Sequence, residues 1–162
     1  ALQINDKAKA YLWDAKNLDQ WGKKYDLIWT TWFTAGNFYP EDFSFENYPI
    51  DNQTLDLTTN PSFDKIFRAA YQLLNPNGAI VLGACYKDNM NTQKKQEKAY
   101  LKMGMNLITS NKDSFTATRE GFWSQRFTKK KIYNYFDFVD KNKIKFTNLD
   151  PYDYAMQITI LK

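Results

Sequence analysis

The segment FDKIFRAAYQLLNPNGAIVLGACY, residues Phe63 to Tyr86, predicts the fold around which the rest of the chain is arranged. Its first half carries apolar residues three and four positions apart, the pattern of a helix with one buried face. Asn75-Pro76-Asn77-Gly78 ends that helix, because proline disfavours helical backbone before it and glycine tolerates a positive φ. Ala79 to Cys85 is then almost continuously apolar, which is typical of a parallel strand flanked by helices on both faces. The segment predicts an α/β fold.

The composition narrows the classes of protein to consider. The 162 residues are 43% hydrophobic, enough for a single domain with a real core. The aromatic content of 17% indicates bulky core packing or a pocket that stacks a flat ligand. The net charge of +4 is milder than in most dedicated nucleic-acid binders. There is no histidine, which excludes Ser-His and Cys-His catalysis and most zinc sites, so we expect no metal.

The single cysteine, Cys85, lies inside the apolar strand, where we expect a small core residue. One cysteine cannot form an intrachain disulfide, which favours a reducing compartment. No apolar stretch approaches about 18 residues and no signal peptide opens the chain. These features predict a cytoplasmic protein that does not span a membrane.

Shorter elements surround the central segment. Ala10 to Trp13 is expected to form a strand that ends at Asp14, and Tyr25 to Phe33 a second, buried parallel strand. Thr92 to Met103 reads as a lysine-rich surface helix. Met105 to Gln125 reads as a long connection, and Thr128 as the N-cap of a helix reaching about Phe136.

The chain should close with two strands, Lys143 to Leu149 and Tyr154 to Leu161. The link between them is too short for a parallel crossover, so they are expected to pair antiparallel.

This order resembles the second half of a class I S-adenosylmethionine-dependent methyltransferase. Trp13-Asp14-Ala15 is similar to the acidic motif that recognises the adenine of the cofactor, and Tyr25 to Trp29 to the fourth strand of the family. Phe63 to Tyr86 is similar to its helix, Pro-x-Gly turn and fifth strand, and Phe127 onward to its last helix and closing hairpin. The resemblance implies a Rossmann-like, mostly parallel sheet with helices on both faces and a C-terminal antiparallel hairpin.

The Gly-rich turn of that family is not matched, because none of the six glycines forms G-x-G. The interpretation is a single methyltransferase-like domain over residues 1–162 that lacks its first strand-helix-strand unit.

The resemblance implies a cofactor site for S-adenosylmethionine. Asp14 and Ala15 would hold the adenine at the carboxyl end of a parallel strand. Thr30, Thr31 and Trp32 end the next strand, where hydroxyls could hold the ribose or amino-acid end and the indole could shape the methyl-transfer cavity. The alternatives are a turn-forming aspartate and ordinary core packing of the tryptophan. No catalytic residue is assigned, since methyl transfer needs little acid–base help and depends mainly on positioning.

The acceptor side is expected to include Asn37, Tyr39, Trp123 and Arg126. Asn37 could orient a substrate and Tyr39 could line its pocket. An arginine fork could bind a carboxylate or phosphate, although a surface ion pair is the alternative.

Three functions follow as hypotheses. The first is a methyltransferase acting on a small-molecule acceptor, and the second is a non-catalytic binding or interaction module. The third is an RNA-directed methyltransferase, suggested by the pI of about 9.0 and the aromatic and basic segment from Phe122 to Tyr135. Nucleic acid is the less favoured partner, and the sequence does not give the oligomeric state.

Overall fold

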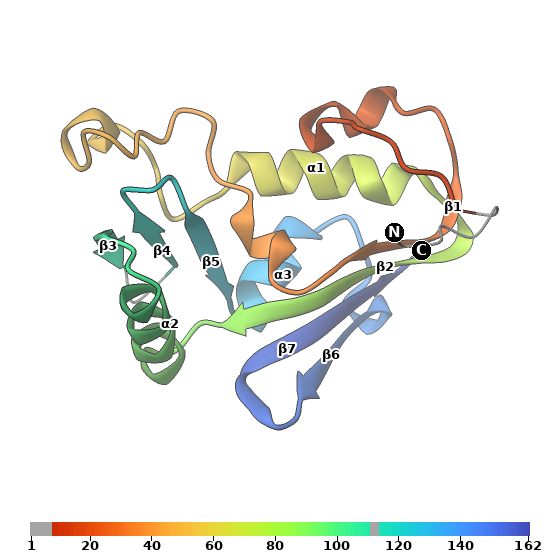
Figure 1. The fold of residues 1–162 in the computed structure, drawn as a ribbon. Helices are drawn as coiled ribbons and strands as arrows, with labels where there is room; N and C mark the ends of the chain where they lie inside the picture. The colour runs from red at the N-terminus through yellow and green to blue at the C-terminus, as the bar shows by residue number, and fades with distance from the viewer. Residues whose placement is uncertain (1–7, 111–113) are drawn as a thin grey trace.

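The computed structural model describes residues 8–110 and 114–162, and its architecture is organised on the long strand β2 (Leu74–Lys87) (Figure 1). The other strands are β1 (Tyr25–Thr30), β3 (Leu107–Ser110), β4 (Phe115–Thr118), β5 (Trp123–Phe127), β6 (Ile144–Leu149) and β7 (Tyr152–Leu161). The α-helices are α1 (Pro61–Gln72), α2 (Met90–Lys102) and α3 (Lys129–Tyr135). Short 3-10 helices are η1 (Ala15–Gln20), η2 (Thr34–Asn37), η3 (Ile50–Asn52) and η4 (Lys141–Lys143).

The strands form one mixed sheet in the order β3-β4-β5-β2-β7-β6, with β1 also paired to β2. Among the described residues, β1 and β5 run parallel to β2, whereas the other four strand pairings are antiparallel. The sheet is strongly curled, like half of a barrel (Figure 1). The predicted Rossmann-like, mostly parallel sheet is therefore wrong, and so is the resemblance to a class I methyltransferase that implied it.

The error has a physical origin in the two apolar strands. Burial in β2 alternates: Ile80 and Leu82 are fully buried, whereas Val81 between them is only partly buried. In β1, Leu27 and Trp29 are 55% and 63% exposed. An unbroken apolar run thus does not mean that helices cover both faces of these strands.

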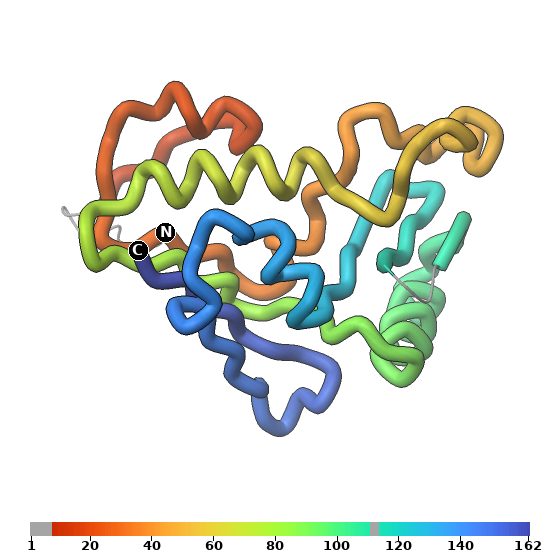
Figure 2. The backbone as a smooth tube through the Cα atoms, turned by 180° about the vertical axis from the view of Figure 1, so that it is seen from behind, coloured from red at the N-terminus to blue at the C-terminus, as the bar shows by residue number. Residues whose placement is uncertain are grey.

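The main core lies on one face of the sheet. Figure 2 shows α1 and α3 on one side of the strands. The core joins these two helices to the inward residues of β2, β6 and β7. Its largest fully buried members are aromatic or branched and include Phe63, Phe136, Ile80, Leu82 and Ile158. A second, aromatic cluster lies under the loop before η3 and contains Phe43, Phe115, Ala117 and Trp123.

Side chains cap the starts of α1 and α3, and the predicted N-cap Thr128 is confirmed. The side chain of Asn60 accepts a hydrogen bond from the Phe63 backbone N–H at 3.0 Å, with Pro61 in the first turn of α1. The Thr128 hydroxyl accepts from the Lys131 backbone N–H at 3.1 Å and caps α3. The lysine-rich helix α2 begins at Met90, two residues before its predicted start.

The segment Asn75-Pro76-Asn77-Gly78, predicted as a turn ahead of the strand, lies within β2, which begins at Leu74. The positive φ falls on Asn77, at 65°, rather than on Gly78. Gly78 is required for another reason, because a Cβ there would lie 3.0–3.2 Å from the carbonyl oxygens of Asn75, Asp26 and Tyr25. The close approach of β1 to β2 therefore selects this glycine.

Two other expectations about the elements are wrong. Ala10 to Trp13 is irregular rather than a strand. Most of the presumed connection from Met105 to Gln125 is the antiparallel set β3, β4 and β5. These strands are only four or five residues long, and of the three only β4 alternates, with Phe115 and Ala117 apolar between threonines. The closing hairpin is as predicted, with β6 and β7 antiparallel and joined through Asp150 and Pro151.

Within residues 8–110 and 114–162, no helix is long and apolar enough to cross a membrane.

Candidate binding pocket

A cavity of about 380 Å³ lies where the carboxyl end of β1 meets the β6–β7 hairpin. The β1 end and the loop after it contribute Trp29, Thr31, Trp32 and Phe33; β2 contributes Gly83 and Ala84; the hairpin contributes Leu149, Asp150, Tyr152, Tyr154 and Ala155. The pairing of Tyr86 in β2 with Ala155 in β7 brings these distant segments together. A mostly apolar, aromatic hollow with a few polar groups is the usual form of a small-molecule site.

The aromatic rings at this cavity have two orientations. Phe33 stacks on Tyr86 with centroids 3.8 Å apart and planes 6° apart. Tyr154 lies 6.4 Å from Phe33 and is inclined by 28° to it, so these rings form a nearly parallel set. Tyr152 meets Tyr154 at 63°, with centroids 5.6 Å apart. The near-parallel rings thus offer a surface on which a flat group can stack, and the Tyr152 ring stands at a steep angle to that surface.

Trp32 has an unusual backbone at the mouth of the cavity. Its φ is +44°, a left-handed conformation that bulky residues rarely adopt and that costs of order 1–3 kcal/mol. The Trp32 carbonyl accepts a hydrogen bond from the Ala84 N–H at 3.0 Å, which helps to hold the turn on β2. The indole remains 70% exposed. Strained backbone that presents a large aromatic ring to solvent is typical of a ligand-binding position.

Gly83 leaves room for the Trp29 indole on the open face of the sheet. A Cβ on Gly83 would lie 2.4 Å from the Thr30 carbonyl oxygen and 2.6 Å from the Trp29 Nε1. The absence of a side chain at Gly83 therefore sets where this wall of the cavity lies.

The two aspartates of the hairpin, Asp150 and Asp153, have different surroundings. Asp153, outside the cavity lining, pairs with Lys95 at 2.5 Å, and its carbonyl accepts from Lys87 at 2.9 Å. Asp150 lines the cavity, where it is the only ionisable acid or base apart from the tyrosines in the described lining. The cavity therefore carries one negative charge in a chain whose net charge is +4.

The predicted cofactor residues are divided between the cavity and other positions. Thr31 and Trp32 line the cavity. Asp14 is exposed, and its carboxylate accepts from the Lys16 N–H at 2.9 Å as the cap of η1. Ala15 packs at the edge of the main core. Thr30 is partly buried, and its Oγ1 has no hydrogen-bond partner in the part of the chain that the structure describes.

Of the predicted acceptor residues, Trp123 belongs to the aromatic cluster, Tyr39 packs beside it, and Asn37 lies in η2. Trp123 is 3% exposed, stacks on Phe115 at 3.8 Å and lies 6.4 Å from the ring of Tyr39. Asn37 ends η2, and its Oδ1 is buried with no hydrogen-bond partner within the described residues. None of the three lines the cavity described above.

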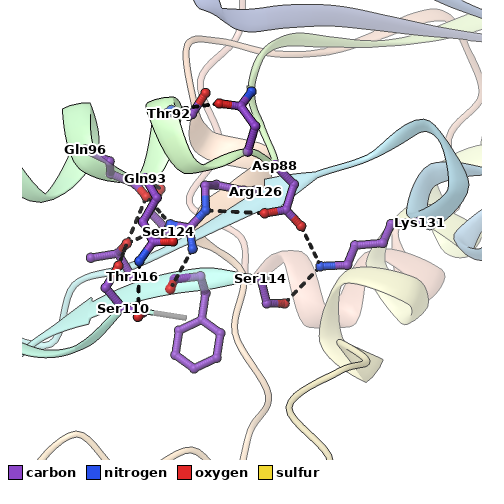
Figure 3. Close-up of polar contacts among 12 residues, drawn as sticks. Asp88, Thr92, Gln93, Gln96, Ser110, Ser114, Thr116, Ser124, Arg126 and Lys131 are labelled. Carbon is purple, nitrogen blue, oxygen red and sulfur yellow. Dashed lines mark hydrogen bonds and ion pairs between the residues drawn. The ribbon is translucent and has the colours of Figure 1, made fainter. Parts of the chain in front are cut away.

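Arg126, the fourth, is fully buried inside a polar network (Figure 3). Its guanidinium lies 3.5 Å from the Asp88 carboxylate and donates to the side chains of Gln96 at 2.6 Å and Thr116 at 2.8 Å. Lys131 approaches the same carboxylate at 3.0 Å. Burial lowers the pKa of Arg126, and the charge of Asp88 opposes that shift. The arginine thus joins β5, β4 and α2 instead of facing solvent.

Sequence reasoning missed most of the cavity. Phe33, Asp150, Tyr152 and Tyr154 were assigned only to a strand end, a link and a strand, and Trp29 only to a buried strand. The dense aromatic content was the available signal, but grouping these rings requires the β2–β7 register.

Cys85 is an inert core thiol, as predicted. It is 1% exposed, and burial raises its pKa well above the usual value. Burial likewise raises the pKa of Tyr86, next to it in β2.

We therefore expect stability to fall with rising pH through Cys85. The unfolded thiol ionises above about pH 8.5 while the folded thiol stays neutral, so the unfolded state binds fewer protons there. Between pH 8.5 and 9.5 the wild type should lose about 1 kcal/mol more unfolding free energy than Cys85→Ala. Urea unfolding in the presence of a reductant measures this. Equal losses in the two proteins would show that Cys85 titrates alike in the folded and unfolded states.

The comparisons with family models and with curated proteins assign no family to this chain. No family model matches it, and no curated protein matches it.

Proposed function

We propose that this protein binds a small, largely apolar organic molecule in the aromatic cavity between β1 and the β6–β7 hairpin. The observation that carries the proposal is the strained, exposed Trp32 at the mouth of a cavity of about 380 Å³. Such a volume suits a ligand of one or two rings. The stacked set of Phe33, Tyr86 and Tyr154 supports a flat ligand, because offset stacking favours near-parallel rings.

This proposal is closest to the binding-module hypothesis. Methyl transfer from S-adenosylmethionine remains a prediction from sequence, as do the cytoplasmic location and binding to RNA. Only Thr31 and Trp32 of the five predicted cofactor residues line the cavity, and the Asp14 carboxylate caps η1 instead. Asp14, Ala15 and Thr30 do not line this cavity, and we derive no methyl-transfer step from the five residues.

Calorimetric titration with 2-naphthol, a neutral two-ring probe, tests the proposal. We expect saturable binding with a Kd on the order of 0.1–1 mM, as for a ligand of this size in a partly open site. Trp32→Ala should weaken binding at least about fivefold through loss of one aromatic wall. A parallel titration with S-adenosylmethionine tests whether that molecule is itself a ligand.

The matched control is Trp13→Ala. Trp13 is 49% exposed, packs on Trp21 and does not line the cavity. Equal weakening by the two substitutions, or no saturable binding of 2-naphthol to the wild type, would contradict the proposed site.

A further inference from the structure

We infer that the natural ligand of this cavity carries an alkylated cation, of the quaternary ammonium type, held between the aromatic walls and Asp150. The inference rests on the proposed function and names the chemical class of ligand for the same site.

The charge of the cavity lining favours a cationic ligand. Asp150 is the lone carboxylate of the lining, and the described lining includes no lysine or arginine. The nearby lysines Lys95 and Lys87 contact Asp153 rather than Asp150, and Lys95 also lies over the Tyr154 ring. No ion pair joins Asp150 to another residue described by the structure. A cationic ligand would give the Asp150 carboxylate a positively charged partner, whereas the carboxylate would repel an anion.

The aromatic walls of the cavity also favour a cation. Trp29, Trp32 and Tyr152 are 63%, 70% and 45% exposed and present ring surface at the cavity. Aromatic faces attract cations through the ring quadrupole, most strongly for tryptophan. Tyr152 lies across the Tyr154 plane at 63°, so a compact group could contact more than one ring. An alkylated cation suits these walls better than a bare ammonium, because its methyl groups need no hydrogen-bond acceptors.

The protein contains the same combination of groups beside the cavity. The Lys95 Nζ lies 5.3 Å from the centroid of the Tyr154 ring and pairs with the Asp153 carboxylate at 2.5 Å. A tyrosine ring and an aspartate of this hairpin thus hold a cation together. Tyr152 and Asp150 offer the corresponding pair of groups on the cavity side, with the tryptophans added.

The test compares two molecules of nearly equal shape. Choline carries a trimethylammonium group, and 3,3-dimethylbutan-1-ol replaces its nitrogen by carbon. We expect the wild type to bind choline about tenfold more tightly than the neutral analogue. Asp150→Asn should reduce that preference to about threefold or less, while leaving the affinity for the neutral analogue unchanged.

Two further variants keep the result interpretable. Asp19→Asn removes the same charge from an exposed position in η1 and should leave the preference for choline intact. Tyr152→Leu should weaken choline more than 3,3-dimethylbutan-1-ol, and it tests the inference even if Asp150→Asn disturbs the hairpin. Melting temperatures of all variants are measured first.

The outcomes separate the inference from the proposed function. Equal affinity for choline and its neutral analogue, or failure of both to bind while 2-naphthol binds, would overturn the inference and leave the cavity as a neutral site. Failure of all three probes would contradict the proposed function as well. A preference for choline that survives both Asp150→Asn and Tyr152→Leu would place cation binding outside this cavity and overturn the inference.

Discussion

Replacing Arg126 by methionine is expected to lower the free energy of unfolding by about 3 kcal/mol or more. The substitution leaves the buried Asp88 carboxylate with Lys131 but without its guanidinium partner. It also removes the donors to Gln96 and Thr116. Breaking a buried ion pair from one side is costly because the remaining charge stays desolvated. Urea unfolding monitored by circular dichroism measures the loss.

Arg68→Met is the matched control. Arg68 contacts Asp64 and Asp137, both at 2.8 Å, but its side chain is 41% exposed, so its loss should cost about 1 kcal/mol or less. The double variant Asp88→Leu with Arg126→Met should recover part of the loss, because both buried charges are then gone. A loss below about 1 kcal/mol for Arg126→Met would mean that the network is hydrated and not a buried structural element.

Phe63→Ala should cost about 3–5 kcal/mol, the usual range for a buried phenylalanine. Phe63 is fully buried at the start of α1 and packs against Phe67, Phe127 and Tyr135 at ring distances of 4.4–5.2 Å. Its removal leaves a cavity where α1 and α3 meet the sheet, and these rigid rings cannot easily fill it. Thermal and urea unfolding of the variant measure the effect.

Phe138→Ala removes the same side chain from a position that is 39% exposed. It should cost about 1 kcal/mol, mainly through contacts with Tyr71 and Arg68. Similar losses for Phe63→Ala and Phe138→Ala would contradict a core centred on α1.

Local signals in the sequence were sufficient for the helix caps and the closing hairpin. Asn60 and Thr128 cap their helices through bonds to residues three positions away, and Asp150-Pro151 is too short for anything but an antiparallel return. Interactions over such short separations are visible in a single sequence.

The sheet as a whole was not predictable in the same way. An apolar run such as Ala79 to Cys85 does not reveal whether one or both faces of the strand are covered. Trp29 has the apolar character of a core residue, although it is 63% exposed. The short strands β4 and β5 are covered by α2 and the aromatic cluster, and of the two only the four residues of β4 alternate between apolar and polar. The arrangement of the sheet therefore depends on long-range pairing, which the periodicity of each segment does not contain.

The candidate site was predictable in part. Thr31 and Trp32 were named because the family resemblance implies a cofactor at the end of the predicted strand that contains them, and both line the cavity. The hairpin side of the cavity, with Asp150 and Tyr152, enters only through the pairing of β2 with β7. Arg126 was chosen for its charge, but the structure surrounds that charge with its own partners.

The most direct test of the aromatic cavity as the ligand site follows the tryptophan indole N–H signals in a nitrogen-15 spectrum during titration with 2-naphthol. Trp29 and Trp32 line the cavity, whereas the Trp21 indole donates to the Tyr25 hydroxyl and Trp123 is buried in the separate aromatic cluster. We predict saturable shifts of the Trp29 and Trp32 signals with one common Kd, while the Trp21 and Trp123 signals stay in place. Shifts confined to Trp21 or Trp123, or no saturable shift of any indole signal, would contradict the proposed site.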